Sequence, residues 1–247
     1  RGIPVYVNAG VNAQSVAEHT LALMLACLKR LPQINRQTHE GVWKKQQVGV
    51  TTRELHGKTV ALVGMGNIGR LVAKMLQPFG VKIIYTDVFR QPKDVEERLE
   101  LTFFDSFEAM LPEADILSFH CPLTIENAEM LNANTLAMMK QGAIIINTAR
   151  GKLINPDDLY DALRSGHLAS AALDTHYEEP LQVRIRANTC DTWRPTYRLA
   201  ELDNVILTPH IGGLSYEAFE SMMLGAMQNI QAFQEGRLDE IASKRLF

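Results

Sequence analysis

Apolar residues in this sequence fall into short continuous runs that alternate with segments of helical periodicity. Runs such as TVALV (59–63) and AIIIN (143–147) contain no alternating polar positions, which is typical of parallel strands buried on both faces. Between them, NIGRLVAKML (67–76) spaces its apolar residues as an amphipathic helix does. Strands and helices in this order predict right-handed crossovers in a doubly wound parallel sheet. The predicted fold class is therefore α/β, with a Rossmann-type sheet.

The same pattern places the individual elements along the chain. Strands, with the turns that follow them, are predicted at 60–64, 82–87, 115–122, 143–151, 168–174 and 204–213. Helices are predicted at about 67–76, 94–100, 132–140, 155–166 and 216–234. Because parallel strands run in the same direction, the turns after them are expected to meet at one edge of the sheet, where open α/β folds bind ligands.

The amino-terminal segment predicts a short strand at 3–8 and then a long helix that ends near Arg30. Ser15 and the glutamate three residues later have the spacing of a capping box. The helix is apolar on nearly all sides, so we expect it to be buried against another domain or another subunit. The polar residues 31–56 predict an irregular segment that Trp43 anchors.

Composition and charge exclude several classes of function. Of the 247 residues, 46% are apolar and 21% are charged, as in ordinary globular proteins, and the net charge of −3 argues against a nucleic-acid or membrane-surface binder. No segment reaches the roughly 18–20 apolar residues that a membrane span needs. Cys27, Cys121 and Cys190 are too few and too scattered for a disulfide framework or a zinc cluster. We therefore expect a cytoplasmic protein without a metal, membrane or nucleic-acid partner.

Three glycines, Gly64, Gly66 and Gly69, connect a predicted strand to a predicted helix. Their G-x-G-x-x-G spacing is a weak signal by itself, but between a strand and a helix it predicts a dinucleotide-binding loop. Gly64 allows the tight turn, Gly66 lets the backbone approach a pyrophosphate, and Gly69 lets the helix pack closely on the sheet. The amides of Asn67 and Ile68 are then expected to face the phosphates.

Asp87 ends the next strand, 18 residues after Gly69. A carboxylate at this point accepts hydrogen bonds from both hydroxyls of an adenosine ribose, and its charge repels the 2′-phosphate of NADP. The sequence thus predicts NAD as the cofactor, with Arg90 near enough to soften the preference over NADP. The alternative is a glycine turn followed by a strand-end aspartate with no ligand.

A series of further motifs, together with the glycine loop, resembles the successive signatures of the D-isomer-specific 2-hydroxyacid dehydrogenase family. In chain order they are GVNAQSVAEH, ELHGKTVALVGMGNIGR, HCPLT, NTARG, AALD followed by EEP, and TPHIGG, and they lie between about Gly2 and Gly213. The resemblance implies hydride transfer between NAD and a small D-2-hydroxy acid or 2-keto acid. It also implies a homodimer, with the long apolar helix at its interface.

The resemblance assigns the catalytic roles to Arg150, Glu179 and His210. A guanidinium at position 150 is suited to clamp a substrate carboxylate and to polarise the adjacent carbonyl. The imidazole of His210 is suited to exchange a proton with the substrate hydroxyl, and Glu179 is the carboxylate that pairs with it. Taken alone, an arginine at a strand end more often forms an ion pair, and two glutamates before a proline are more often a solvated loop. Glu178 is the neighbouring alternative to Glu179.

Further residues are expected to line the cofactor cleft because of the same resemblance. Asp174 is expected near the nicotinamide carboxamide, although a buried aspartate that caps a local turn remains open. Nothing in the sequence activates Cys121 as a nucleophile, so backbone and apolar contacts are expected of it. The cofactor contacts implied beyond the glycine loop and Asp87 are Cys121, Pro122, Asn127, Thr148, Ala149, Arg150, Asp174, His210 and Gly212.

The resemblance divides the chain into three parts. Residues 1–11 are expected to be a remnant of a second, flavodoxin-like substrate domain. Residues 12–212 are expected to form the NAD-binding domain, with the dimerisation helix at its start, and 213–247 a helix that returns to the substrate domain. Most of the substrate domain precedes residue 1 in the family pattern, and the chain opens without a methionine. We therefore expect it to begin inside a domain, and to bind NAD yet lack full activity.

Two features leave the function open at this point. The loop at 181–204 is longer and more basic than the family pattern, so it is either a solvated insertion or a contact for an anionic substrate or a neighbouring subunit. Its arginines are Arg184, Arg186, Arg194 and Arg198. The alternative from another class is a non-catalytic, NAD-sensing interaction protein, as in the family's corepressor branch. A hydrolase similar to adenosylhomocysteinase would not explain NTARG, EEP and TPHIGG in this order.

Overall fold

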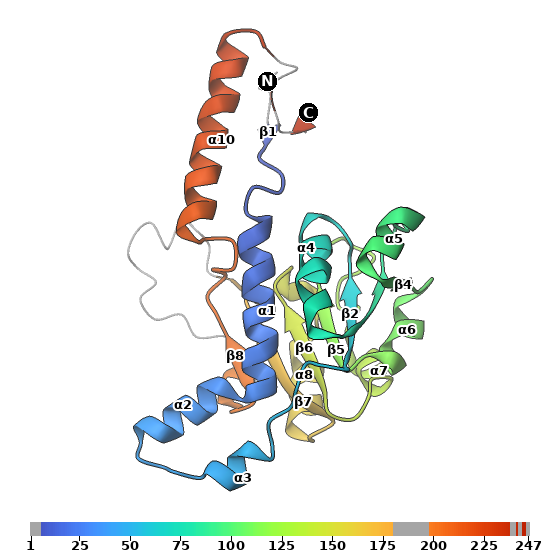
Figure 1. Cartoon of the computed structure of the whole chain (residues 1–247), viewed down its shortest axis with the longest axis vertical. Coiled ribbons are helices and arrows are strands. Elements are labelled where there is room, and N and C mark those ends of the chain that lie inside the picture. The colour runs from blue at the N-terminus through green and yellow to red at the C-terminus, as the bar shows by residue number, and fades with distance from the viewer. Residues whose placement is uncertain (1–5, 180–197, 238–240, 242–243, 246–247) are drawn as a thin grey trace.

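Seven parallel strands form the central sheet, in the order β4-β3-β2-β5-β6-β7-β8 (Figure 1). The computed structural model describes residues 6–179, 198–237, 241 and 244–245. Within these residues the strands of the sheet are Thr59–Val63 (β2), Lys82–Thr86 (β3), Leu101–Phe103 (β4), Ile116–Phe119 (β5), Ala143–Asn147 (β6), Leu168–Leu173 (β7) and Val205–Leu207 (β8). Because β2 pairs in parallel with both β3 and β5, the strand order reverses beside β2. Ligands of open α/β sheets bind at such a reversal.

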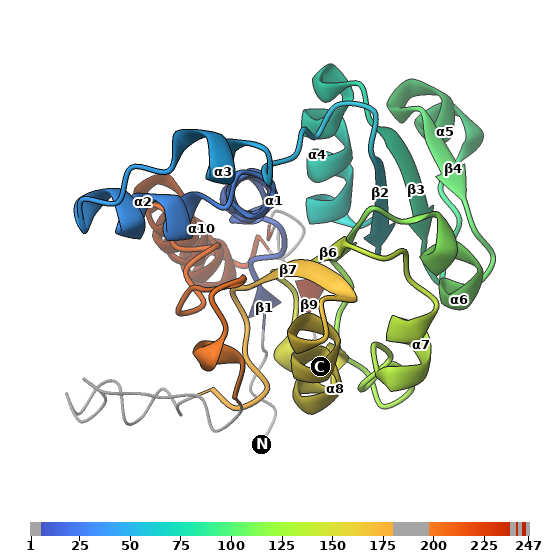
Figure 2. The ribbon, with the colours of Figure 1, turned by 90° about the horizontal axis from the view of Figure 1, so that it is seen from below.

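Helices cover both faces of this sheet (Figure 2). The α-helices are Ala13–Lys29 (α1), Leu31–His39 (α2), Lys45–Gly49 (α3), Asn67–Leu76 (α4), Lys93–Leu99 (α5), Phe107–Met110 (α6), Ala133–Ala137 (α7), Pro156–Arg164 (α8) and Tyr216–Gln234 (α10). Short 3-10 turns lie at Gln77–Phe79, Leu111–Glu113, Gly151–Leu153 and Arg198–Glu201. The α/β class with a doubly wound, Rossmann-type sheet is confirmed.

The apolar runs of the strands fill two separate cores, one on each face of the sheet. On β2, Val60 and Leu62 join the core beneath α1 and α4, whereas Ala61 and Val63 join the core beneath α7 and α8. All four side chains are buried. Full burial of a Val or Leu side chain contributes about 1.5–3 kcal/mol, so both faces of each strand must be apolar. This requirement explains why the runs carry no polar alternation.

Two short elements escape prediction from the sequence. The strand β4 has three residues and the helix α6 has four, so neither is long enough to show a period. The longer elements, in contrast, agree closely with the pattern. The helices α4 and α10 have the predicted bounds, 67–76 and 216–234.

The helix α1 differs from its prediction in two ways. It begins at Ala13 with Asn12 as the N-cap, and no side chain caps it, so the predicted capping box is wrong. The hydroxyl of Ser15 instead donates to the carbonyl of Gly212, 2.6 Å away. The buried face of α1 packs against α4, β6 and β7 of the same chain, whereas the prediction was burial against another domain or subunit. The apolar character of α1 is therefore largely explained within the chain.

Residues 31–56 are more regular than their polar composition predicts, since they contain α2 and α3. Neither helix has a buried residue, so both lie on the surface without an apolar face toward the core. The side chain of Trp43 is 81% exposed. The prediction that Trp43 anchors this segment is therefore wrong.

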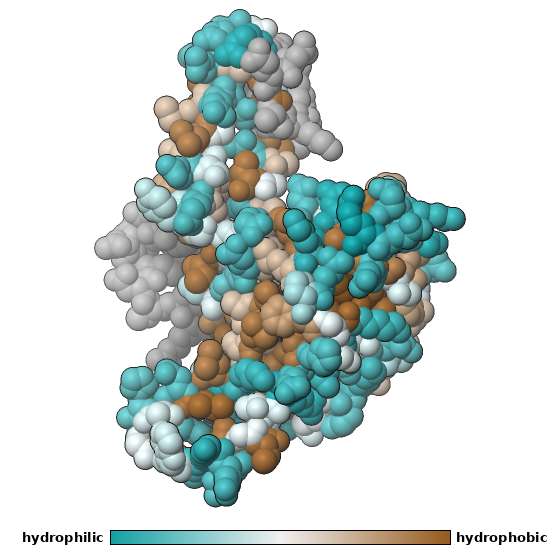
Figure 3. Space-filling view, viewed as in Figure 1, coloured by the Kyte–Doolittle hydropathy of each residue, from teal (hydrophilic) through white to brown (hydrophobic). Residues whose placement is uncertain are grey.

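The two ends of the described chain lie together, away from the main sheet (Figure 1). Tyr6–Val7 (β1) pairs antiparallel with Lys244–Arg245 (β9), and the ring of Tyr6 lies 6.3 Å from that of Phe233 on α10. Apolar side chains interrupt the polar surface along α10 (Figure 3). The exposed ones are Tyr216, Phe219, Met223, Leu224, Met227, Ile230 and Phe233.

No helix among the described residues combines the length and apolarity needed to cross a bilayer. Of the predicted basic loop, Arg184, Arg186 and Arg194 lie outside the described residues. Arg198 is described: its guanidinium pairs with Glu201 at 3.1 Å and lies 4.5 Å above the ring of Tyr160.

Candidate active site

The three glycines of the predicted loop have different surroundings. Gly64 has a φ of +97°, and a Cβ there would lie 2.8 Å from the amide nitrogen of Cys121. A Cβ at Gly69 would collide with the carbonyl oxygen of Gly64. At Gly66, in contrast, a Cβ would meet nothing within 4 Å. The fold therefore requires glycine at 64 and 69, whereas the open space at Gly66 fits the approach of a ligand to the backbone.

The start of α4 supplies donors beside this open space. Gly66 is the N-cap of α4, and no side chain caps the helix. The first hydrogen bond that closes the helix runs from the amide of Arg70 to the carbonyl of Gly66, so the amides of Asn67, Ile68 and Gly69 are not used inside it. Such amides, with the positive end of the helix dipole, bind phosphate groups. The residues present thus fit the pyrophosphate of a dinucleotide.

Asp87 lies beside the same loop. Its carboxylate accepts a hydrogen bond from the amide of Met65, at 2.5 Å, and another from the amide of Phe89, at 3.2 Å. The first contact ties the end of β3 to the glycine loop after β2. The carboxylate is therefore placed next to the cradle, where the ribose of a dinucleotide is expected.

Arg90, the residue that was predicted to soften the preference for NAD, has a different partner. Its guanidinium forms two hydrogen bonds of 2.9 Å with the carboxylate of Glu96 and stacks 5.1 Å from the ring of Phe103. The bond from Arg90 and one from Tyr85 lower the pKa of Glu96, whereas burial and the contact with Glu96 raise the pKa of Tyr85 to about 12. Arg90 is thus engaged in a local network.

His210 and Glu179 form a hydrogen bond at the same edge of the sheet, with 2.9 Å between Nδ1 and Oε2. The other oxygen of Glu179 accepts a hydrogen bond from the amide of His176 at 3.0 Å, which fixes the carboxylate from behind. His210 follows β8 and has a φ of +56°, which residues other than glycine rarely adopt. About half of the His210 side chain is exposed, so the ring remains accessible to a substrate.

Arg150 lies in the loop that follows β6. This loop packs closely against the segment after β7, and the closest approach is at Gly151. A Cβ at Gly151 would collide with the backbone of His176 and Tyr177. The loop is held from inside by Asn147, whose side chain donates to the carbonyl of Arg150 at 2.9 Å. The exposed guanidinium of Arg150 donates a hydrogen bond to the backbone carbonyl of Ala149 at 2.6 Å. The loops that carry Arg150 and Glu179 are therefore in direct contact.

Asp174 is buried at the end of β7, with 1% of its surface exposed. Its carboxylate accepts hydrogen bonds from the hydroxyl of Thr208 (2.6 Å) and from the amides of Ile211 (3.0 Å) and Gly212 (2.9 Å). Burial by itself would raise the pKa of this carboxyl. The hydrogen bond from His19 and the three hydrogen bonds above stabilise the charged carboxylate more strongly, so its pKa lies well below its usual range. The carboxylate thus organises the turn that carries His210, and its contact with a nicotinamide stays a prediction.

The loop after β5 borders the glycine loop. The side chain of Asn127 shapes it, because its amide donates to the carbonyl of Pro122 (2.8 Å) and its oxygen accepts from the amide of Thr124 (2.7 Å). Burial raises the pKa of the Cys121 thiol to about 11 and lowers that of the His120 imidazole to about 3. Cys121 is therefore a thiol and His120 a neutral ring at physiological pH, and neither is suited to catalysis there.

Thr148 and Ala149 follow β6 and are buried. The hydroxyl of Thr148 lies 2.9 Å from that of Thr20 on α1, and the amide of Ala149 donates to Asn147 at 3.0 Å. No group of three or more His, Cys, Asp or Glu in the described part of the chain is arranged to hold a metal ion. The predicted cofactor residues thus lie after β2, β3, β5, β6, β7 and β8, all at the same end of their strands.

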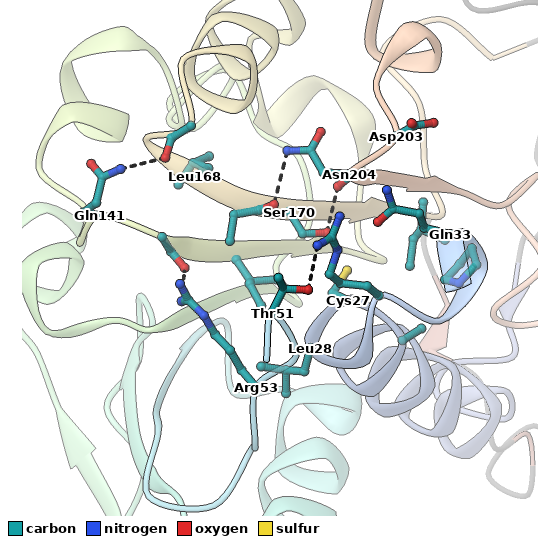
Figure 4. A pocket seen from close by; sticks show the side chains of 18 residues that line it. Cys27, Leu28, Gln33, Thr51, Arg53, Gln141, Leu168, Ser170, Asp203 and Asn204 are labelled. Atoms are coloured by element: carbon teal, nitrogen blue, oxygen red, sulfur yellow. Dashed lines mark hydrogen bonds between the residues drawn. The ribbon is translucent and has the colours of Figure 1, made fainter. Parts of the chain in front are cut away.

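A cavity of about 430 Å³ lies at the opposite edge of the sheet, where β6, β7 and β8 begin (Figure 4). Its polar groups bind one another: Arg53 donates to the carbonyl of Gly142 at 2.8 Å, and Ser170 donates to the carbonyl of Asn204 at 2.7 Å. None of the predicted site residues lines this cavity. The glycine loop and the His210–Glu179 pair therefore mark the candidate active site, and this cavity lies apart from it.

Most of the chain matches a known protein family. Residues 21–212 match the model of the D-isomer specific 2-hydroxyacid dehydrogenase, NAD binding domain. The chain belongs to this family. The membership confirms the resemblance inferred from the sequence, and with it the class of NAD-dependent oxidoreductase and NAD as the cofactor.

Individual dehydrogenases of the family are similar over nearly the whole chain. The glyoxylate reductase of Thermofilum pendens is 38% identical over 240 residues, which cover 96% of this chain and 67% of that protein. The hydroxypyruvate reductase of Thermotoga maritima is 39% identical over 218 residues, which cover 88% of this chain and 66% of that protein. The chain thus spans about two thirds of the length of these relatives.

Solved structures of family dehydrogenases share the fold. The D-lactate dehydrogenase of Aquifex aeolicus, complexed with NAD and lactic acid, superposes with a TM-score of 0.87 at 31% identity, over 99% of this chain and 73% of that one. The formate dehydrogenase of Granulicella superposes with a TM-score of 0.87 at 29% identity, over 95% of this chain and 59% of that one.

Residues that the sequence did not single out also contact the candidate site, among them His19, Gly151 and Thr208. Gly151 belongs to the motif NTARG, which pointed to Arg150, and Thr208 belongs to the motif TPHIGG, which pointed to His210. His19 carries a usable signal, because it is a polar residue one helical turn after Ser15 in an otherwise apolar helix. Only the fold shows what these residues contact.

Proposed function

We propose that the protein reduces a small 2-keto acid to the D-2-hydroxy acid with NADH, and catalyses the reverse oxidation with NAD. The observation that supports this most strongly is the distance of 2.9 Å between Nδ1 of His210 and Oε2 of Glu179. This pair lies at the same edge of the sheet as the glycine loop. When bound, the nicotinamide supplies or accepts the hydride. The residues of the chain supply the proton and hold the substrate.

The geometry suggests how these residues divide the work. Glu179 engages Nδ1 of His210, which leaves Nε2 of the ring to face the substrate. In reduction, Nε2 of His210 donates a proton to the carbonyl oxygen of the keto acid, and in oxidation it takes the proton of the hydroxyl. Arg150 binds the carboxylate of the substrate and polarises the carbonyl beside it. The residues after β2, β3 and β5 hold the dinucleotide.

The relatives indicate which substrates to test first. Their names include glyoxylate reductase, hydroxypyruvate reductase and D-3-phosphoglycerate dehydrogenase. We infer a small, unbranched 2-keto acid, with glyoxylate and hydroxypyruvate as the first candidates. The fold by itself does not select among them.

The test uses the full-length protein that contains this chain. Oxidation of NADH is measured with glyoxylate, hydroxypyruvate, pyruvate and phosphohydroxypyruvate, and reduction of NAD with D- and L-enantiomers of the corresponding hydroxy acids. Steady turnover with at least one keto acid and a preference for D-enantiomers are expected. Tight NADH binding without turnover on any of these acids would instead favour the NAD-sensing interaction protein.

We also propose that residues 1–11 and 213–247 belong to a second domain, whose other parts cover α10. Two observations support this boundary: β1 and β9 pair with each other outside the main sheet, and α10 exposes seven large apolar residues. Limited proteolysis of the full-length protein is expected to cut near residues 11 and 213 before it cuts inside 12–212.

A homodimer is part of the same proposal. On α1, Ala22 is exposed and Leu21 and Leu25 are only half-buried, so an apolar strip remains beside the face that packs on the sheet. Light scattering after size exclusion is expected to give twice the mass of one chain. We place the protein in the cytoplasm, since Cys27 and Cys121 are free thiols.

A further inference from the structure

One stripe of α1 holds the segment that carries His210. The stripe lies along one face of the helix, because its members are three or four positions apart. It consists of Asn12, Ser15, Val16 and His19. Ser15 donates to the carbonyl of Gly212 at 2.6 Å. A Cβ at Gly213 would collide with the side-chain amide of Asn12 and would lie 3.5 Å from Cγ2 of Val16, so both side chains pack on Gly213. The helix thus contacts the chain directly after His210.

His19 makes the polar contacts at the carboxyl-terminal end of this stripe. Its Nε2 lies 3.2 Å from the hydroxyl oxygen of Thr208 and 3.4 Å from Oδ1 of Asp174. The hydroxyl of Thr208 donates its single proton to Asp174, and a carboxylate only accepts. Nε2 of His19 therefore carries a proton and donates it to this pair. The ring also packs on Gly212, where a Cβ would lie 3.2 Å from its Cδ2.

The hydrogen bonds continue from Asp174 to the turn at His210. The carboxylate of Asp174 accepts from the amides of Ile211 and Gly212, the two residues that follow His210. The amide of His210 itself donates to the carbonyl of Thr208 at 3.0 Å. These bonds hold His210 at its φ of +56°, a conformation that a histidine rarely adopts without such support.

We propose that His19 is a positioning residue for His210. Through Thr208 and Asp174, it fixes the left-handed turn that directs the imidazole of His210 toward Glu179 and the substrate. The helix α1 thereby sets the geometry of proton transfer, in addition to covering the sheet. This inference rests on the proposed function, because it assigns His210 the proton transfer.

Three variants of the full-length protein test the inference. His19→Leu keeps the volume of the side chain and removes the donor. His19→Gln keeps an N–H donor at a similar distance from the backbone. His39→Leu makes the same substitution at an exposed position of α2, away from this stripe, and serves as the matched control. For each protein we measure kcat, KM, the Kd of NADH, the solvent deuterium isotope effect on kcat, and amide hydrogen exchange at Ile211 and Gly212.

For His19→Leu we expect a kcat about 10–100 times lower, with the Kd of NADH unchanged within twofold. A proton donor that is out of place makes proton transfer more rate-limiting, so the solvent isotope effect is expected to increase. Exchange at Ile211 and Gly212 is expected to become at least ten times faster. His19→Gln restores most of the kcat and of the protection, and His39→Leu behaves as the wild type.

The outcomes separate this inference from the proposed function. A wild-type protein without turnover refutes the proposed function, and this inference with it. An active wild type whose His19→Leu variant keeps its kcat refutes this inference alone. The inference is also refuted if kcat falls while exchange at Ile211 and Gly212 stays unchanged, or if His19→Gln is as impaired as His19→Leu, because the donor then does not act through the turn.

Discussion

Nδ1 of His210 lies 2.9 Å from Oε2 of Glu179, although 31 residues separate them in the chain. Each residue follows a different strand, Glu179 after β7 and His210 after β8. Because β7 and β8 are neighbours in a parallel sheet, both loops emerge at the same edge. The pairing of strands therefore brings together the two residues of the proposed acid/base pair.

Replacement of His210 by Asn is expected to lower the turnover of the full-length protein by a hundredfold or more, since His210 is the proposed donor and acceptor of the proton. NADH binding is expected to remain within about threefold of the wild type, because the cradle lies after other strands. Turnover and NADH fluorescence titration measure the two effects. Turnover that survives the substitution would show that His210 is not the acid/base residue. Replacement of the exposed His39 of α2 is the control, with no effect expected.

Alanine substitutions at Gly66 and Gly69 are expected to impair different properties, NADH binding at Gly66 and folding stability at Gly69. Gly66→Ala adds a Cβ in the open space where the cofactor is expected, so the fold is unchanged. The Kd of NADH is expected to rise about tenfold, which corresponds to a loss of about 1.4 kcal/mol of binding free energy. Gly69→Ala places a Cβ against the carbonyl of Gly64, so we expect a loss of about 1–3 kcal/mol of folding stability. Urea unfolding and NADH titration measure the two quantities. Equal losses of stability in both variants would contradict the cradle.

Replacement of Asp87 by Ser is expected to change the cofactor preference. The variant loses acceptors for the ribose hydroxyls, so the Kd of NADH rises by about tenfold, in line with about 1.5 kcal/mol for a charged hydrogen bond. It also loses the negative charge that repels a 2′-phosphate, so NADPH binds more tightly than to the wild type. Titration with both cofactors measures the ratio. An unchanged ratio would place the ribose elsewhere.

Alkylation of Cys121 is expected to depend steeply on pH. Burial raises the pKa of this thiol to about 11, and a raised pKa favours the thiol over the reactive thiolate. The rate with iodoacetamide is therefore expected to be slow at neutral pH and to rise about tenfold per pH unit until about pH 11. Mass spectrometry of the Cys121 peptide follows the reaction, and the urea-unfolded chain is the reference. Reaction at neutral pH as fast as in the unfolded chain would contradict the burial, and bound NADH is expected to slow the reaction further.

Part of the site could be predicted because its signals are local. The glycine loop requires particular residues at fixed spacings between a strand and a helix, and Gly64, Gly66 and Gly69 satisfy that requirement within six positions. Arg150 and His210 stand in short motifs at strand ends. The contacts of Ser15, His19 and Thr208, however, join positions that are about 190 residues apart or more. No local pattern encodes such pairs.

The sequence by itself determined the parallel sheet, the positions of most strands and helices, and the loops that carry the candidate chemistry. It did so because burial on both faces of a strand and on one face of a helix imposes periods that a single segment displays. Only the tertiary structure decided which polar groups meet. Ser15 binds the turn after β8 and not its own helix, Trp43 lies in solvent, and Asp174 supports the turn at His210. A polar side chain takes the partner that the packed elements place within about 3 Å, and that distance is set by the whole fold.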